Sequence, residues 1–251
     1  MLGAVGSSRG WRYTAVGKHP VARDYFRVGE TEPMINGFAE WVGSGYRALE
    51  VAARPAMSAL LSYRFFARGP GRDMLACGVL RDSSDALGRP YPLLLMGCGP
   101  LKGWEDSWDL LPLACEKTWE QMEYASAAAH VDVARFDAQV RGTRAPDGDW
   151  GGLSARRGAP GGPEAGIAER VSGQIGLPDF ILRLGDGGSV DVGLAASLGF
   201  SRTRSRGQAA PNAVFLGGTF ERTRLAVYNR SLTASDFAAL WGADPSGGGR
   251  N

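Results

Sequence analysis

The longest apolar block in the chain, residues 91–96, constrains the fold more than any other feature. It has the length of a strand and is apolar on both faces, so a strand made from it must be covered on both sides. Further strands are expected over 61–67 and 74–80, and the spacing of apolar residues predicts a helix over 34–53. Strands that alternate with helices predict an α/β fold built in layers.

A glycine- and proline-rich segment separates the N-terminal part of the chain from a shorter C-terminal part. Residues 142–166 hold eight of the 37 glycines and three prolines, a composition that predicts a flexible loop. Strands are expected beyond it over 180–184, 213–216 and 224–228. A C-terminal part of about 70 residues is small for a core of its own. We therefore expect one domain over residues 1–251, with the C-terminal strands in the same sheet.

Composition and charge exclude several classes of protein. The formal net charge is only +2 and no dense block of lysine and arginine occurs, so a nucleic-acid partner is not expected. No run approaches the roughly 20 apolar residues of a membrane-spanning helix, and residues 1–11 lack the pattern of a signal peptide. We therefore expect a cytoplasmic protein without direct membrane insertion. Its cysteines, Cys77, Cys98 and Cys115, match no zinc or redox spacing and are expected to be buried free thiols.

Residues that carry chemistry are few. Only two histidines occur, His19 and His130, and no nucleophile, zinc-protease or phosphate-loop motif accompanies them. Three acidic residues, Asp24, Asp82 and Asp85, stand beside predicted turns. Their side chains are expected to bond the backbone rather than a metal ion. The residues alone therefore predict no metal, no cofactor and no enzyme activity, and they leave the function open.

Two polar segments beside the predicted strands follow recognisable patterns. Residues 17–25 read GKHPVARDY, and residues 78–93 read GVLRDSSDALGRPYPL. Both resemble segments of the TagF family of type VI secretion-associated proteins, whose patterns are Gly-Lys-x-Pro-x-x-Gly-Asp-Phe and Gly-Val-x-x-x-Ser-x-Asp-x-x-Gly-Arg-x-(Phe/Tyr)-Pro-Leu. Arg23 stands where the family usually has glycine, and a left-handed backbone there would be strained. The matching residues that we take as candidate site residues are Gly17, Lys18, Pro20, Asp24, Ser83, Asp85, Gly88, Arg89 and Pro92.

The resemblance implies a fold, a function and a partner. The fold is an α/β three-layer sandwich with a mixed central β-sheet flanked by helices. The function is that of a cytoplasmic post-translational repressor of a bacterial type VI secretion system, which acts by binding a forkhead-associated scaffold protein. A rival class stays open: a small-ligand sensor or an enzyme that uses the cleft formed by the two motif segments.

The two motif segments are expected to converge in space. Arg89 is predicted to bind Asp24 or Asp85 and so to hold the two loops together, since a guanidinium can bind a carboxylate with two parallel hydrogen bonds. Two roles remain open for these polar residues, namely pinning the fold or forming a surface for a partner or ligand. A concave pocket lined by them would favour a ligand, whereas a flat exposed face would favour a protein partner.

Overall fold

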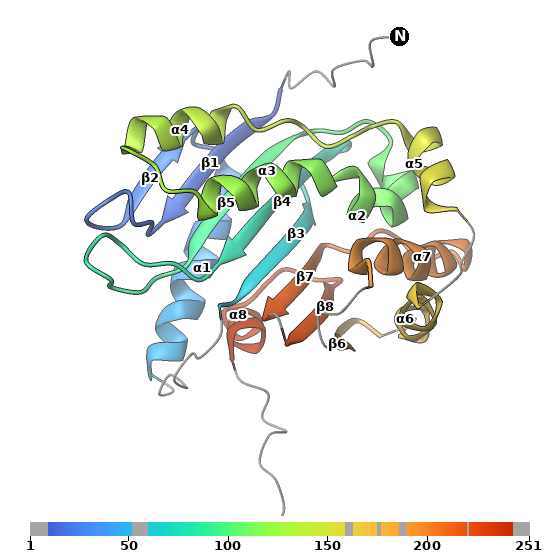
Figure 1. The fold of residues 1–251 in the computed structure, drawn as a ribbon. Coiled ribbons are helices and arrows are strands. Elements are labelled where there is room, and N and C mark those ends of the chain that lie inside the picture. The colour runs from blue at the N-terminus through green and yellow to red at the C-terminus, as the bar shows by residue number, and fades with distance from the viewer. Residues whose placement is uncertain are drawn as a thin grey trace, which may run out of the picture.

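The computed structural model describes residues 10–51, 60–158, 163–174, 177–185, 190–219 and 221–242. Its eight described strands form a single sheet in the order β2-β1-β5-β4-β3-β7-β8-β6 (Figure 1). The strands are β1 (Arg12–Gly17), β2 (Phe26–Gly29), β3 (Ser62–Arg68), β4 (Met74–Arg81), β5 (Leu93–Pro100), β6 (Asp179–Gly185), β7 (Ala213–Thr219) and β8 (Arg222–Tyr228).

Every strand pairing among the described residues is antiparallel, so the prediction of a mixed sheet is wrong. The reason lies in the connections. β3, β4 and β5 follow one another as neighbours in the sheet, as do β7 and β8, and hairpin connections make such neighbouring strands run in opposite directions. The C-terminal strands β6, β7 and β8 lie in the same sheet as the N-terminal ones, as predicted.

The central strand β5 shows how the two sides of the sheet are covered. Leu94, Met96 and Cys98 join one apolar core, whereas Leu93 and Leu95 join the other. This alternation follows from the two-residue period of a strand, and it confirms the expectation of a strand covered on both faces. Helices therefore pack on both sides of the sheet, but a strict three-layer sandwich stays a prediction.

The two faces carry different numbers of helices (Figure 1). One face is packed by α1 (Pro33–Val51) and α8 (Ala234–Trp241), whose apolar residues share a core. The other face is packed by a longer series of helices. They are the 3₁₀ helix η1 (Trp104–Leu110), α2 (Leu111–Ala114), α3 (Glu116–Ala127), α4 (Val133–Arg141), α5 (Trp150–Arg157), α6 (Glu164–Ser172) and α7 (Val192–Ser205).

Close packing of α1 against α8 explains a glycine in the middle of α1. A Cβ atom on Gly45 would lie 2.3 Å from Cβ of Phe237, so only glycine allows the two helices to approach this closely. The start of α8 is fixed by a capping box between Thr233 and Asp236. Trp41 of α1 donates its indole N–H to the carbonyl of Thr233 over 2.7 Å. These contacts fasten the C-terminal helix to the N-terminal part of the chain.

The segment expected to be a flexible loop, residues 142–166, contains helix α5 and the start of α6. Asp149 caps α5 by accepting a hydrogen bond from the N–H of Gly152 over 3.0 Å, and Leu153 is buried in the main core. The cap and this buried leucine stabilise a helix despite the high glycine content. The prediction of a long loop is therefore wrong over α5. Residues 159–162 lie outside the described residues, and the flexibility of the segment stays a prediction.

The cysteines and the described helices bear on two further expectations. Cys77, Cys98 and Cys115 are buried and free, as predicted. Within the described part of the chain, no helix is both long enough and apolar enough to cross a bilayer.

Candidate functional site

The two predicted motif segments meet at one end of the sheet. Residues 18–25 connect β1 to β2, and residues 82–92 connect β4 to β5; we call these two connections the motif loops. The sheet register pairs Gly17, at the end of β1, with Leu93, at the start of β5. Arg81, at the end of β4, pairs with Leu93 from the other side. The antiparallel register therefore places both loops side by side, at the left of Figure 1.

A buried carboxylate lies at the centre of the motif loops. The side chain of Asp85 is fully buried, and Lys18 Nζ and Arg89 Nε lie 3.0 Å and 2.8 Å from its Oδ2 atom. Its Oδ1 atom accepts hydrogen bonds from the backbone N–H groups of Leu87 and Arg89, each over 3.0 Å. Four donors thus replace water around one carboxylate, which is how a buried charge is tolerated in a protein. The two backbone bonds are the turn chemistry that the sequence predicted.

Opposing effects act on the pKa of Asp85. Burial raises this pKa, but the hydrogen bonds from Lys18, from the backbone of Arg89 and Leu87, and from the Arg89 guanidinium outweigh burial. The pKa of Asp85 is therefore held well below its usual range. The carboxylate stays ionised at neutral pH and acts only as an acceptor of hydrogen bonds, so it has no proton to donate there.

Arg89 joins the two motif loops, as predicted. Besides its bond to Asp85, its Nη2 atom lies 3.4 Å from Oδ2 of Asp24 and donates to the carbonyl of Arg23 over 2.7 Å. The structure uses both carboxylates that the sequence offered as partners, and the buried Asp85 is the closer one. A backbone hydrogen bond of 2.8 Å, from the N–H of Ala86 to the carbonyl of Ala22, makes a second link.

Two motif glycines have backbone angles that favour glycine. Gly17 has a φ of +131°, and a Cβ atom there would lie 2.1 Å from the carbonyl oxygen of Pro92. Gly88 has a φ of +76° but faces open space. Arg23 does not have a positive φ, because Asp73 alone does among the described non-glycine residues. The strain expected at Arg23 is therefore absent, and the loop accommodates the departure from the family pattern.

The remaining candidate residues are exposed or contribute backbone hydrogen bonds. Pro20 is exposed at the turn after β1. The carbonyl of Ser83 accepts a hydrogen bond from the N–H of Tyr91 over 3.0 Å. The ring of Tyr91 in turn contacts the edge of Tyr25 at a centroid distance of 5.4 Å, which adds an aromatic contact between the motif loops.

A pair of histidines lies beside the motif loops, an arrangement that the sequence did not reveal. His19 is 3% exposed, its ring lies 5.5 Å from that of His130 and 4.8 Å from that of Phe136, and its Nδ1 accepts from the N–H of Val21 over 3.1 Å. Burial lowers the pKa of His19 to about 4, with a further contribution from His130. The two histidines stand 111 positions apart in the sequence, and only the fold brings them together.

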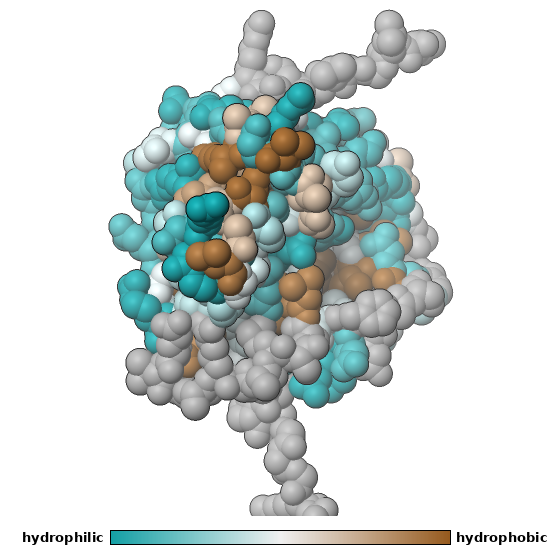
Figure 2. Space-filling model, turned by 60° about the vertical axis from the view of Figure 1, so that its left-hand side comes forward, coloured by the Kyte–Doolittle hydropathy of each residue, from teal (hydrophilic) through white to brown (hydrophobic). Residues whose placement is uncertain are grey.

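Three apolar side chains project from this end of the molecule. Tyr25 is 49% exposed, Leu87 is 67% exposed, and Val131, in the connection between α3 and α4, is 93% exposed. His130 places this third connection next to the motif loops. Figure 2 brings this end forward and shows hydrophobic areas set among hydrophilic ones. We define the loop face by its exposed residues Arg23, Tyr25, Leu87, Arg89 and Val131.

The loop face has the composition of a protein-binding surface. Aromatic and arginine side chains are enriched in protein interfaces, and exposed apolar groups gain free energy when a partner removes them from water. The Asp85 network bonds the backbone at Leu87 and Arg89 and, through Arg89, the carbonyl of Arg23, so it fixes the two motif loops. The geometry shows that these loops are pinned within the fold. Whether they also bind a partner stays a prediction.

Comparison with known proteins identifies an α/β protein associated with secretion. The sequence matches the TagF N-terminal domain, described as type VI secretion system-associated, over residues 14–142, just over half of the 251-residue chain. The chain therefore belongs to the TagF family, as the motif segments indicated. A search of curated proteins found no match.

A solved structure shares the fold. The crystal structure of PA0076 from Pseudomonas aeruginosa PAO1 is similar, with a TM-score of 0.52 over 95% of this chain and 100% of that chain. The two sequences are 17% identical, so the likeness concerns the fold. It extends well beyond residues 14–142 and therefore includes the C-terminal strands.

Proposed function

We propose that this chain represses a type VI secretion system in the cytoplasm by binding a forkhead-associated scaffold protein through the loop face. Membership of the TagF family supports the association with secretion. The observation that carries the binding site is the exposure of Tyr25 and Leu87 on the two motif loops that the buried Asp85 joins, with the exposed Val131 in the neighbouring connection. The scaffold partner is taken from the family resemblance.

A rigid loop face reduces the entropic cost of association. Asp85 binds Lys18, Arg89 and two backbone N–H groups, so the backbone around Leu87 is already ordered before a partner arrives. A pre-ordered surface retains more of its interaction free energy as affinity. On this proposal the candidate site residues of the two motifs hold the surface in place, and the exposed side chains between them contact the partner.

The rival proposal of a ligand or reaction site between the motif loops has less support. The Asp85 side chain is fully buried and Lys18 is 13% exposed, so the charged groups of these loops already contact each other. A catalytic carboxylate or amine needs access to its substrate within hydrogen-bonding distance. We therefore propose that the protein acts by stoichiometric binding rather than as an enzyme.

The dose response of secretion tests this proposal. The chain is expressed at graded levels in a secretion-active strain, and secreted substrate is measured against the molar ratio of the chain to its scaffold. A stoichiometric repressor lowers secretion in proportion to this ratio and silences it near equimolarity, because each copy occupies one site. Complete repression at about one copy per hundred scaffolds would indicate catalysis instead. Repression in a strain without the scaffold would show that the partner is wrong.

A further inference from the structure

A cavity lies at the end of the sheet opposite the motif loops. It has a volume of about 380 Å³ and is lined by the N-terminal half of α1, the end of β3, the start of β7 and the connection between β8 and α8. This volume falls within the range of small-molecule sites. We name it the α1 pocket and define it by Met34, Gly37, Phe38, Trp41, Asn212 and Leu232.

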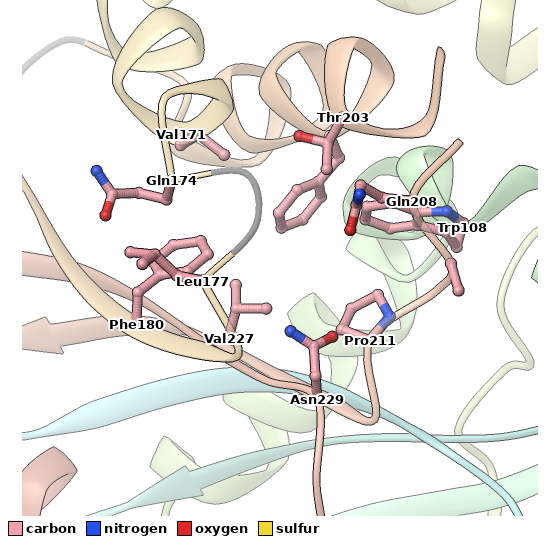
Figure 3. A pocket seen from close by; sticks show the side chains of 12 residues that line it. Trp108, Val171, Gln174, Leu177, Phe180, Thr203, Gln208, Pro211, Val227 and Asn229 are labelled. Carbon is pink, nitrogen blue, oxygen red and sulfur yellow. The ribbon is translucent and has the colours of Figure 1, made fainter. Parts of the chain in front are cut away.

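A second cavity is too small for the same purpose. Figure 3 shows it between Trp108 and Thr203 on one side and Phe180 and Val227 on the other. Its volume is about 40 Å³, enough for little more than a bound water molecule. The α1 pocket is therefore the better candidate for a ligand.

The floor of the α1 pocket is aromatic and held in place. The ring of Phe38 stacks on Phe65 at a centroid distance of 5.1 Å, and its edge meets Trp41 at 6.0 Å. Trp41 is fixed further by its hydrogen bond of 2.7 Å to the carbonyl of Thr233. Met34 adds a thioether, which makes favourable contacts with aromatic rings. The pocket thus offers a preformed apolar surface suited to another ring.

Gly37 keeps the α1 pocket open. Glycine weakens the interior of a helix relative to alanine, so its presence there needs a reason. For Gly43 and Gly45 of the same helix the reason is packing, since a Cβ atom would meet Tyr91 at 3.3 Å and Phe237 at 2.3 Å. A Cβ atom on Gly37 would meet nothing within 4 Å. Packing therefore does not require this glycine, and because Gly37 lines the pocket, we expect a larger side chain there to narrow it.

The charges around the α1 pocket are already paired or turned away. Arg230 lies 2.7 Å from Asp236 and 2.7 Å from Asp179. Arg68 lines the pocket, but its guanidinium lies over the ring of Trp104, 5.3 Å from the centroid, on the opposite face of the sheet. A charged ligand would lose water here without meeting an unpaired opposite charge. The pocket therefore favours an uncharged ligand, with the side chains of Asn212 and Ser231 as neutral polar groups in its wall.

We propose that the α1 pocket binds a small, uncharged aromatic molecule. The proposal rests on the volume of the pocket, its aromatic floor and the presence of Gly37, which packing does not require. It is independent of the scaffold partner. The probe is 2-naphthol, compared with the anion 2-naphthoate and the cation 2-naphthylmethylamine, with binding to the whole chain measured by isothermal titration calorimetry. We expect saturable binding of 2-naphthol with a dissociation constant below about 1 mM. Both charged analogues should bind at least roughly tenfold more weakly.

A substitution that fills the α1 pocket gives the most decisive test of ligand binding there. Gly37→Leu should weaken 2-naphthol at least roughly tenfold, since its side chain takes the ligand's space, and the melting temperature should rise because leucine favours helix. Gly37→Ala should give a smaller loss of affinity and also a higher melting temperature. Gly166→Leu is the matched control, because Gly166 lies in helix α6, also faces open space and is remote from the pocket. It should leave binding unchanged.

Three results would overturn the proposal. They are the absence of saturable 2-naphthol binding up to about 1 mM, wild-type affinity in both Gly37 variants, and charged analogues that bind as tightly as 2-naphthol. Each result counts only for variants whose melting temperature confirms that they are folded.

Discussion

The two ends of the sheet differ in which side chains are buried and which project into solvent. At the motif loops a charged network is buried beneath apolar side chains that project outward, with Asp85 fully buried and Leu87 67% exposed. At the α1 pocket the aromatic side chains Phe38 and Trp41 are recessed, and the two lining arginines contact groups other than the pocket interior. A projecting apolar surface suits a macromolecular partner, whereas a recessed one suits a small molecule.

The two ends of the sheet also differ in the contacts that hold them together. The motif loops depend on a few irreplaceable contacts, among them the close approach of Gly17 to Pro92 and the bonds to Asp85. The α1 pocket is lined by a helix, two strand ends and the connection between β8 and α8, and it includes a glycine that packing does not require. Substitutions should therefore affect stability strongly at the first end and weakly at the second.

The largest expected effect is that of Gly17→Ala. The new Cβ atom would lie 2.1 Å from the carbonyl oxygen of Pro92, in a backbone with a φ of +131°. We expect a loss of roughly 3 kcal/mol in the free energy of unfolding, which lowers the melting temperature by roughly 6–12 °C in a chain of this size. Gly88→Ala is the control, since its φ is also positive but its surroundings are open. It should cost only about 1 kcal/mol in denaturant titrations. Equal losses would contradict the steric explanation.

A smaller loss is expected when the buried carboxylate is neutralised. Asp85→Asn removes the charge that Lys18 and Arg89 share, which leaves two cations without their buried partner. The melting temperature should fall by several degrees, and amide hydrogen exchange at Leu87 and Arg89 should accelerate. Asp24→Asn should change the melting temperature hardly at all, because the Asp24 side chain is 71% exposed. If the two variants behave alike, Asp85 is not the centre of the network.

The effect confined to the narrowest conditions is a pH dependence that arises at His19. Its pKa is lowered to about 4 in the folded protein, whereas an unfolded chain has a histidine pKa near 6.5. The unfolded state therefore binds the proton first, so His19 makes the free energy of unfolding fall as the pH drops from about 6.5 to about 4. His19→Gln should flatten this part of the profile. The protection factor of the Val21 amide, whose N–H binds His19, should fall over the same range in the wild type. An unchanged slope in the variant would exclude His19 as the cause.

The sequence predicted the features of the motif loops that depend on local spacing. Asp85 and Arg89 stand four positions apart in one turn, so their contact could be inferred from residue types and distance along the chain. Strand positions could be inferred in the same way, because an apolar run of the right length has few alternatives. The central strand begins at Leu93, two positions later than predicted.

Features that join distant segments escaped prediction. The α1 pocket is lined by residues from four separate segments, and no pattern in any one of them reveals a cavity. His19 and His130 meet only because α4 packs on β1 and β2 while α3 packs on β4 and β5. The antiparallel register of β3 with β7 joins residues about 150 positions apart, which local patterns do not determine. Helix α5 was missed because its Asp149 cap and buried Leu153 lie in a glycine-rich stretch.

On our proposal, the partner binds the loop face and not the opposite end of the sheet. The most direct test measures the affinity of the purified scaffold protein for four versions of the chain: the wild type, Leu87→Ser, Gly37→Leu and Ile181→Ser. Ile181 is 42% exposed on β6, at the edge of the sheet away from the motif loops, and serves as the control for loss of a surface apolar side chain. We expect Leu87→Ser to weaken binding at least roughly tenfold, as loss of a central apolar contact does. The other two variants should stay within about twofold of the wild type. Unchanged affinity in Leu87→Ser, or a tenfold loss in Gly37→Leu, would contradict this proposal.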